Sequence, residues 1–377
     1  MKIVFTGGGT GGHFYPIIAV AERVNEIINH ESIIGAKLYY LSDDPYDKEA
    51  LFENSLTYQE INAGKMRTYF SLRNFFDLFK TFFGMISALF KVFLIYPDVV
   101  FGKGGYASFP TLLAAKILHI PVLIHESDSA PGRVNKWAGK FAKKIAISFN
   151  EAGAHFPIKN VAWTGHPIRK EIEQNETKEK ALNYFKLKED VPIVFVLGGS
   201  QGAEIINNTI LDALPKLVEN YQIIHQTGIK NFKIVKTQAD IILENSKNKN
   251  RYIPIAFLNP LAMKMSAGAA DIVVSRAGST LFEIACWGIP SILVPFTNSN
   301  ADHSKKNAFN YARAGACSVI EEMNMTGNIL FSEINRIVKD KKTWNIMAHN
   351  AKAFHKPNAA MKIARELVDI ALEHERR

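Results

Sequence analysis

The chain is 377 residues long, 47% of its residues are hydrophobic and 21% are charged, and its formal net charge at pH 7 is +9. This length exceeds one ordinary hydrophobic core and predicts two domains, and the composition is that of a globular protein. The excess of positive charge favours an anionic lipid surface or a phosphorylated substrate as partner. Because the basic residues are dispersed and no nucleic-acid-binding motif is present, we expect no nucleic-acid partner.

The two cysteines, Cys286 and Cys317, lack the spacing of a disulfide framework or a zinc site. We therefore expect a reducing cytoplasmic setting and no metal centre. No secretion signal is expected either, because Lys2 leads directly into the first apolar run.

The first predicted strand runs into a loop with five glycines, Gly7 to Gly12, and a helical pattern follows from Phe14 to Ile28. Backbone N–H groups of such a loop, together with the helix N-terminus, can receive a phosphate or a sugar. The spacing Gly7-x-Gly9-x-x-Gly12 also meets the dinucleotide fingerprint, so the loop predicts a Rossmann-like fold without naming its ligand. A β–α turn that binds nothing is the alternative.

Between Tyr69 and Phe93 the sequence is rich in phenylalanine and has helical periodicity. Its charged residues leave apolar runs too short to span a bilayer. The segment is predicted either to pack on a sheet or to form an interfacial patch whose rings enter a membrane while lysines meet anionic headgroups. The residues assigned to this patch are Phe75, Phe79, Lys80, Phe82 and Phe83.

Two further strand-and-loop units follow, Pro97 to Tyr106 and Pro121 to Gly132, and a third closes the first half at Arg169. The pattern restarts after the charged stretch 170–189, with a buried strand at 192–197, a glycine loop at 198–203 and further strands at 223–225, 252–255, 270–274 and 290–294. Ligands of open α/β sheets lie beyond the carboxyl ends of the strands. We therefore predict two Rossmann-like α/β domains, 1–165 and 166–350, that face a central cleft, and a C-terminal helical tail, 351–377, that packs on the first domain.

The second half carries its own candidate anion site, because Gly278–Thr280 precedes a helix and offers free N–H groups. Glu283 either completes a capping box with Thr280 or binds a ribose diol. Ser200 is a possible diphosphate donor or an ordinary turn residue, and Arg169 either pairs with phosphate or is solvated. No acidic pair is placed to hold a metal-bound diphosphate, so we expect no cofactor.

Six motifs stand in order along residues 1 to 370, and together they resemble the family 28 glycosyltransferases that convert lipid I to lipid II in bacterial peptidoglycan synthesis. The motifs are Gly8-Gly-Thr-Gly-Gly-His13, Gly102-Lys-Gly-Gly-Tyr106, His125-Glu-Ser-Asp128 with Pro131-Gly132 and Asn135-Lys136, Gly165-His-Pro-Ile-Arg169, Gly198-Gly-Ser-Gln-Gly202, and Ser275-Arg-Ala-Gly-Ser-Thr280 with Glu283. The resemblance implies a GT-B fold that holds UDP-N-acetylglucosamine mainly on the second domain and the lipid-linked muramyl-pentapeptide acceptor on the first. It also implies inverting transfer to the muramyl 4-hydroxyl, peripheral attachment to the cytoplasmic face of the cell membrane, and a part in cell shape and division.

The resemblance further implies roles for single residues. Residues matching the family's UDP-N-acetylglucosamine contacts are Thr10, Gly11, Gly12, Asp128, Arg169, Ser200, Leu258 (through its backbone, at the uracil), Gly278, Ser279, Thr280, Glu283 and His303, and those matching positions of acceptor chemistry are His13, Tyr106 and Asp128. Asp128 stands where many members have asparagine, and Ser304 stands where the family usually has a glutamine that reads sugar hydroxyls. These two departures bear on the choice of donor sugar.

An inverting transfer needs a base for the acceptor hydroxyl. His13 is the best candidate, because the dipole of a helix N-terminus disfavours the imidazolium and predicts a neutral ring at pH 7. A histidine that only organises the loop is the alternative, and Asp128 and Glu126 are rival bases. Ser200 and the N–H groups of Gly278–Thr280 would stabilise the leaving diphosphate.

Three other functions fit parts of the sequence. One is a related transferase that glycosylates another lipid, such as diacylglycerol. Another is a nicotinamide-dependent oxidoreductase that uses the first loop, for which Asp43 or Asp44 would have to hold the ribose, although both lie slightly beyond the usual distance from the loop. The third is a membrane-bound scaffold without catalysis.

Overall fold

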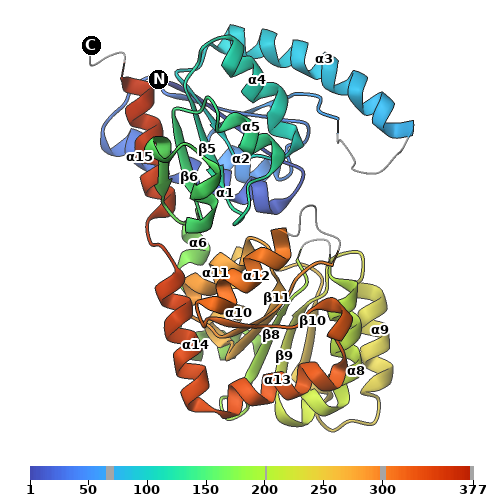
Figure 1. The fold of residues 1–377 in the computed structure, drawn as a ribbon. Helices are drawn as coiled ribbons and strands as arrows, with labels where there is room; N and C mark the ends of the chain where they lie inside the picture. Colours follow the sequence, from blue (N-terminus) through green and yellow to red (C-terminus); the bar gives the residue numbers. More distant parts are fainter. Residues whose placement is uncertain (65–71, 200–201, 298–302, 374–377) are drawn as a thin grey trace. The chain divides into compact units, whose positions relative to one another are not determined.

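The computed structural model describes residues 1–64, 72–199, 202–297 and 303–373, with the backbone alone for 72–80. The chain forms two compact units. Unit 1 consists of residues 1–169 and 356–377, and unit 2 consists of residues 170–355. Figure 1 shows each unit as an α/β structure with a central sheet.

Unit 1 is built on a seven-stranded parallel sheet in the order β3-β2-β1-β4-β5-β6-β7. Its strands are β1 (Lys2–Thr6), β2 (Lys37–Ser42), β3 (Leu56–Glu60), β4 (Val99–Gly102), β5 (Val122–Glu126), β6 (Lys144–Ile147) and β7 (Val161–Trp163). Its helices are α1 (Gly11–His30), α2 (Lys48–Glu53), α3 (Leu72–Ile95), α4 (Phe109–Ile117), α5 (Arg133–Ala138) and α15 (Ala359–Leu372), with 3₁₀ turns η1 (Tyr106–Ser108), η2 (Asn150–His155) and η3 (Ile158–Asn160). Alternate residues of β1 enter two cores: Ile3 and Phe5 pack with α1 and α15, and Val4 packs with α3, α4 and α5. Burial on both faces explains the unbroken apolar runs of the central strands.

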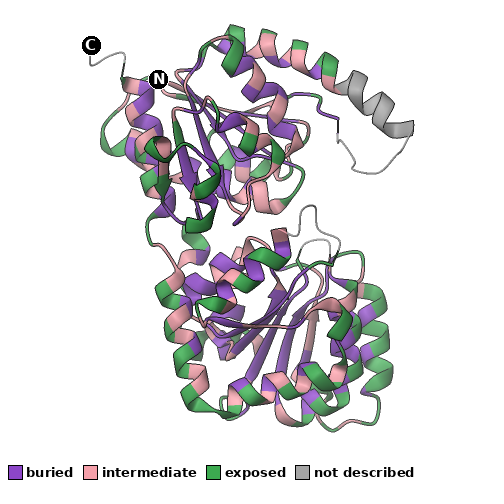
Figure 2. Ribbon diagram, in the orientation of Figure 1, coloured by how far each residue is buried: buried purple, intermediate pink, exposed green. Residues whose placement is uncertain are grey.

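Unit 2 repeats this topology with a six-stranded parallel sheet in the order β10-β9-β8-β11-β12-β13. Its strands are β8 (Ile193–Leu197), β9 (Gln222–Gln226), β10 (Tyr252–Ile255), β11 (Ile272–Arg276), β12 (Ser291–Val294) and β13 (Cys317–Val319). Its helices are α6 (Lys170–Glu173), α7 (Lys178–Phe185), α8 (Glu204–Asn220), α9 (Phe232–Ile242), α10 (Pro260–Ala269), α11 (Thr280–Trp287), α12 (His303–Arg313), α13 (Gly327–Lys339) and α14 (Lys341–Phe354), with 3₁₀ turns η4 (Lys249–Arg251) and η6 (Glu322–Asn324). In Figure 2 the central strands β8, β9 and β11 are buried, while the outer faces of the helices are exposed.

In both sheets the strand order reverses at the first strand. In unit 1, β1 lies between β2 and β4, and in unit 2, β8 lies between β9 and β11. This is the point at which doubly wound folds bind ligands, beyond the carboxyl ends of the strands. The predicted pair of Rossmann-like domains is therefore confirmed.

Several element boundaries differ from those that the sequence suggested. The charged stretch 170–189 holds two short helices, α6 and α7, rather than one. The helical tail is interrupted between α14 and α15, where Pro357 lacks an N–H group and Asn358 has a φ of 61°. After this break, α15 packs on α1 of unit 1.

From Leu72 onward, where the structure describes it, the phenylalanine-rich segment forms one helix, α3. Its residues Ala88 and Val92 are fully buried in the core, so part of the helix packs on the sheet. Gly84 allows this packing, because a Cβ there would lie 1.7 Å from the carbonyl oxygen of Asn62. On the outer side, Phe82 is 53% and Phe83 64% exposed, whereas Phe75, Phe79 and Lys80 lie outside the described side chains.

Candidate functional site in two halves

The half-site of unit 1 is formed by two glycine loops that interlock at the ends of β1 and β4. The N–H group of Lys103 donates to the carbonyl of Thr6 at 2.9 Å. A Cβ on Gly7 would lie 2.9 Å from the Cβ of Lys103, so the first loop needs glycine there to accept the second. Gly105, with a φ of 79°, brings the second loop to the carbonyl of Gly8 and the ring of His13.

His13 lies in the first turn of α1, where its Nδ1 is 3.0 Å from Oγ1 of Thr10. Burial and then the charge of Lys103 lower the pKa of His13 to about 4, while Asp128 acts in the opposite direction. The imidazole is therefore neutral at pH 7. The main cause is desolvation rather than the helix dipole on which the sequence argument relied.

Lys103 is only 2% exposed and is the functional candidate that sequence reasoning missed. Its ammonium donates to Oγ of Ser127, which is 3.4 Å from Nδ1 of His166. Oγ of Ser148 then bridges His166 and His125 at 3.3 and 3.1 Å. Burial lowers the pKa of Lys103 to about 8, against the opposing charges of Glu126 and Asp128. A lysine inside a glycine loop, directly after a buried strand, was the available signal.

Glu126 shapes the loop that carries Asp128. One carboxylate oxygen accepts from the N–H of Asp128 at 2.9 Å, and the other accepts from the N–H of Gly132 at 3.1 Å and from Nδ2 of Asn135 at 2.9 Å. Burial, followed by the charge of Asp128, raises the pKa of Glu126 to about 7. With both oxygens engaged, Glu126 is better suited to hold the loop than to act as the base, whereas Asp128 is half-buried at the surface of the site.

Tyr106 and Arg169 are both held by neighbouring side chains of unit 1. The hydroxyl of Tyr106 donates to Oδ2 of Asp43 at 2.7 Å, so this carboxylate is engaged inside the half-site. The guanidinium of Arg169 lies 4.0 Å from the ring centre of Tyr15, a stacking contact that orients it. The buried Nε of Arg169 has no hydrogen-bond partner among the described residues.

In unit 2 the loop after β11 leads into α11. Thr280 is the first residue of this helix, and Ser279 precedes it without a side-chain capping bond. A Cβ on Gly278 would meet no atom of the described part of the chain within 4 Å. The fold itself does not require glycine there, which fits a backbone that a ligand approaches.

The remaining unit 2 candidates belong to three other parts of the sequence. Leu258 follows β10 and is 3% exposed, so its side chain is buried. His303 begins α12, and its buried Nδ1 has no hydrogen-bond partner among the described residues. Ser200 lies outside the described residues, and the described glycines on either side of it, Gly199 and Gly202, have φ values of 74° and 80°. The structure thus groups Thr10, Gly11, Gly12, His13, Tyr106, Asp128 and Arg169 in unit 1, and Leu258, Gly278, Ser279, Thr280, Glu283 and His303 in unit 2.

Comparison with known proteins identifies the class. The glycosyltransferase family 28 N-terminal domain matches residues 3–147, and the glycosyltransferase family 28 C-terminal domain matches residues 193–363. The chain therefore belongs to glycosyltransferase family 28, and its fold is GT-B.

Relatives with one name match nearly the whole chain. A protein of Pediococcus pentosaceus is 36% identical over 96% of this chain and 97% of its own length, and one of Halothermothrix orenii is 34% identical over 98% and 99%. Both are named UDP-N-acetylglucosamine--N-acetylmuramyl-(pentapeptide) pyrophosphoryl-undecaprenol N-acetylglucosamine transferase. The crystal structure of Acinetobacter baumannii MurG superposes with a TM-score of 0.72 at 23% identity, over 98% of this chain and 99% of that one, and supports the fold.

Within the described ranges, every helix is too short or too polar to cross a bilayer. The same ranges contain no group of three or more histidine, cysteine, aspartate or glutamate side chains placed to hold a metal ion.

Proposed function

We propose that this chain transfers N-acetylglucosamine from UDP-N-acetylglucosamine to the 4-hydroxyl of the muramyl sugar of an undecaprenyl-pyrophosphoryl pentapeptide acceptor, the lipid I to lipid II step of peptidoglycan synthesis. The observation that carries this proposal is the match to relatives of that name over almost the full length of both chains. The family assignment favours a glycosyltransferase over a nicotinamide-dependent oxidoreductase or a scaffold without catalysis.

In this reaction His13 takes the proton of the acceptor hydroxyl. When Nδ1 donates to Oγ1 of Thr10, Nε2 carries the lone pair that accepts this proton. A ring with a pKa of about 4 is a weak base, so the imidazolium needs support as it forms. Asp128 supplies that support, because its charge raises the pKa of His13. Tyr106 lies in the same half-site and borders the acceptor.

The leaving UDP is held by unit 2. The N–H groups of Gly278–Thr280 at the start of α11 stabilise the diphosphate, and Glu283 binds the ribose. The other contacts to the nucleotide come from Ser200, Arg169, His303 and the backbone of Leu258. The donor sugar is contacted by Thr10, Gly11 and Gly12. That the two half-sites face one cleft stays a prediction.

The enzyme works as a peripheral protein on the cytoplasmic face of the cell membrane, where its acceptor resides, and its product serves cell shape and division. The exposed rings of Phe82 and Phe83, followed along α3 by Phe90 and Phe93, which are 62% and 58% exposed, support this placement.

The test is UDP release from several UDP-sugars, with and without a short-chain lipid I analogue. We expect release that depends on the analogue and is fastest with UDP-N-acetylglucosamine. Release that instead requires diacylglycerol, or that proceeds best with UDP-glucose, would assign the chain to the related lipid glycosyltransferases.

A further inference from the structure

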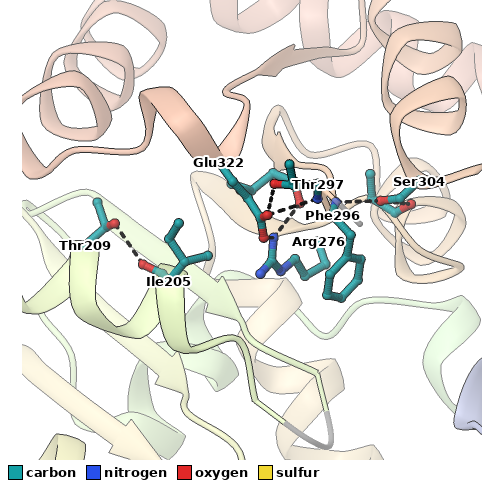
Figure 3. Close-up of polar contacts among 9 residues, drawn as sticks. Ile205, Thr209, Arg276, Phe296, Thr297, Ser304 and Glu322 are labelled. Atoms are coloured by element: carbon teal, nitrogen blue, oxygen red, sulfur yellow. Dashed lines mark hydrogen bonds and ion pairs between the residues drawn. The ribbon is translucent and has the colours of Figure 1, made fainter. Parts of the chain in front are cut away.

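Arg276, the last residue of β11, directly precedes the loop assigned to the nucleotide, yet its guanidinium is engaged by the protein. Nη1 lies 2.5 Å from Oε1 of Glu322 in η6 and 3.4 Å from the carbonyl oxygen of Val294. The guanidinium carbon lies 4.2 Å from the ring centre of Phe296. Figure 3 shows Arg276 between Glu322 and the Phe296 ring.

Further hydrogen bonds lead from Glu322 back to Ala277, the residue after Arg276, and so form a closed circuit of contacts. Oε2 of Glu322 accepts from the N–H of Thr297 at 2.9 Å and from its hydroxyl. The N–H of Phe296 donates to Oγ of Ser304 at 3.1 Å, and this hydroxyl donates to the carbonyl of Ala277 at 3.4 Å. Because Ala277 follows Arg276, the circuit joins the end of β11, the segment after β12, the start of α12 and η6.

The ion pair of the circuit is shielded from water, with 13% of the Arg276 side chain and 19% of the Glu322 side chain exposed. A pair in such a place stabilises a structure only when the remaining carboxylate lone pairs are also satisfied, and here Thr297 satisfies them. Although burial opposes it, hydrogen bonds from Thr297 and Arg276 hold the pKa of Glu322 below its ordinary value. Glu322 is therefore charged at pH 7.

We propose that Arg276 and Glu322 are positioning residues of the donor half-site. Their ion pair fixes the loop from Ala277 to Thr280 relative to Phe296, Thr297 and the start of α12, so that these segments are already arranged when UDP binds. The inference rests on the proposed function, because it assigns the loop to the donor nucleotide. It also places the Ser304 hydroxyl in the scaffold, engaged on both sides, rather than among the groups that select the donor sugar.

A double-mutant cycle tests this proposal with Arg276→Gln, Glu322→Gln and both together, using calorimetric Kd for UDP and steady-state kinetics of the full chain. We expect each single change to raise the Kd for UDP and the KM for the donor about tenfold, with kcat nearly unchanged, and the double variant to be no worse than either single variant. Thr297→Val keeps both charges and should give a smaller rise, so the proposal stays testable if a charge variant folds poorly.

Glu321→Gln is the matched control, because Glu321 is the neighbouring carboxylate and pairs with Lys305 of α12 in an exposed position. It should leave the Kd for UDP unchanged. The proposal is overturned if Glu322→Gln binds UDP like the wild type, or if Glu321→Gln weakens binding equally. It is also overturned if Arg276→Gln raises the Kd for UDP far more than Glu322→Gln does and the two effects add in the double variant. Arg276 would then contact the ligand itself, through the Nε that has no partner among the described residues. A wild-type chain that binds no UDP would overturn the donor assignment along with this inference.

Discussion

The ammonium of Lys103, an almost completely buried residue of the second glycine loop, donates to the hydroxyl of Ser127. This contact ties the loop after β4 to the loop after β5. It also places a positive charge that lowers the pKa of three histidines of unit 1, His13, His125 and His166, in each case second to burial. Lys103 thus links the packing of the half-site to its protonation state.

Replacing Lys103 by methionine should raise the pKa of His13 from about 4, since one of the two causes of its lowering is removed. The value should remain below 6.5, because burial persists. Histidine labelled with ¹³C at Cε1, with the His13 signal assigned through a His13→Gln variant, would report this by NMR titration. Lys116→Met on α4 is the control, and an unchanged His13 titration in Lys103→Met would refute the electrostatic role.

His13→Ala should lower kcat by about 10² to 10⁴ with saturating acceptor, because a general base contributes about this much. The Kd for UDP should change little, since the nucleotide is assigned to unit 2. His30→Ala, an exposed change at the other end of α1, should leave both constants unaltered. A loss of only a few-fold in kcat would show that His13 organises the loop and that another group takes the proton.

Gly278→Ala should weaken UDP binding about tenfold or more without lowering the melting temperature. The added methyl group meets no atom of the described residues within 4 Å, so we attribute the expected loss of affinity to a clash with the ligand. The contrasting variant is Gly84→Ala, whose Cβ would collide with the carbonyl of Asn62 and should destabilise the fold. Calorimetry and thermal unfolding of both variants separate the two outcomes, and unchanged UDP affinity in Gly278→Ala would remove this loop from the donor site.

His225 makes unfolding depend on pH. It is completely buried between the hydroxyl of Tyr252 at 2.9 Å and Oδ1 of Asn207 at 3.0 Å, and burial lowers its pKa to about 3. The unfolded chain binds a proton at His225 from about pH 6.5 downward while the folded chain does not. The free energy of unfolding should therefore be unaffected by this group above pH 6.5 and fall by about 1.4 kcal/mol per pH unit between pH 6.5 and 3.

In urea unfolding of His225→Gln, the free energy of unfolding should fall less steeply with decreasing pH over this range. The difference in slope should correspond to about one bound proton. The variant should be less stable than the wild type at pH 7, because it loses two buried hydrogen bonds. His349→Gln, an exposed change on α14, should keep the wild-type slope. Equal slopes in His225→Gln and the wild type would show that the His225 ring is not held neutral.

The membrane patch is tested by Phe82→Ser with Phe83→Ser. Two exposed rings entering a bilayer contribute on the order of a few kcal/mol, so the double variant should bind anionic phosphatidylglycerol vesicles at least about tenfold more weakly. The control is Ile234→Ser with Ile241→Ser, two residues of α9 that are 63% and 68% exposed. If both pairs weaken vesicle sedimentation equally, the attachment is not specific to α3.

The sequence was sufficient to predict the repeated unit of a strand and a glycine loop, because parallel strands buried on both faces appear in the sequence as continuous apolar runs. It did not reveal β3 or β13, since β13 has only three residues and β3 alternates irregularly between buried and exposed positions. The pairing of Arg276 with Glu322 spans 46 positions and depends on the register of β11 with β12, so no local pattern indicates it. The burial of Lys103 likewise follows from the interlocking of two loops that only the folded sheet brings together.

The central claim, inverting transfer of N-acetylglucosamine to the muramyl 4-hydroxyl, is tested most directly by NMR of the product formed from UDP-N-acetylglucosamine and a short-chain lipid I analogue. We predict a single disaccharide whose new linkage is β and joins C1 of N-acetylglucosamine to O4 of the muramyl sugar. An α linkage, attachment at another hydroxyl, or free N-acetylglucosamine as the only product would contradict the account.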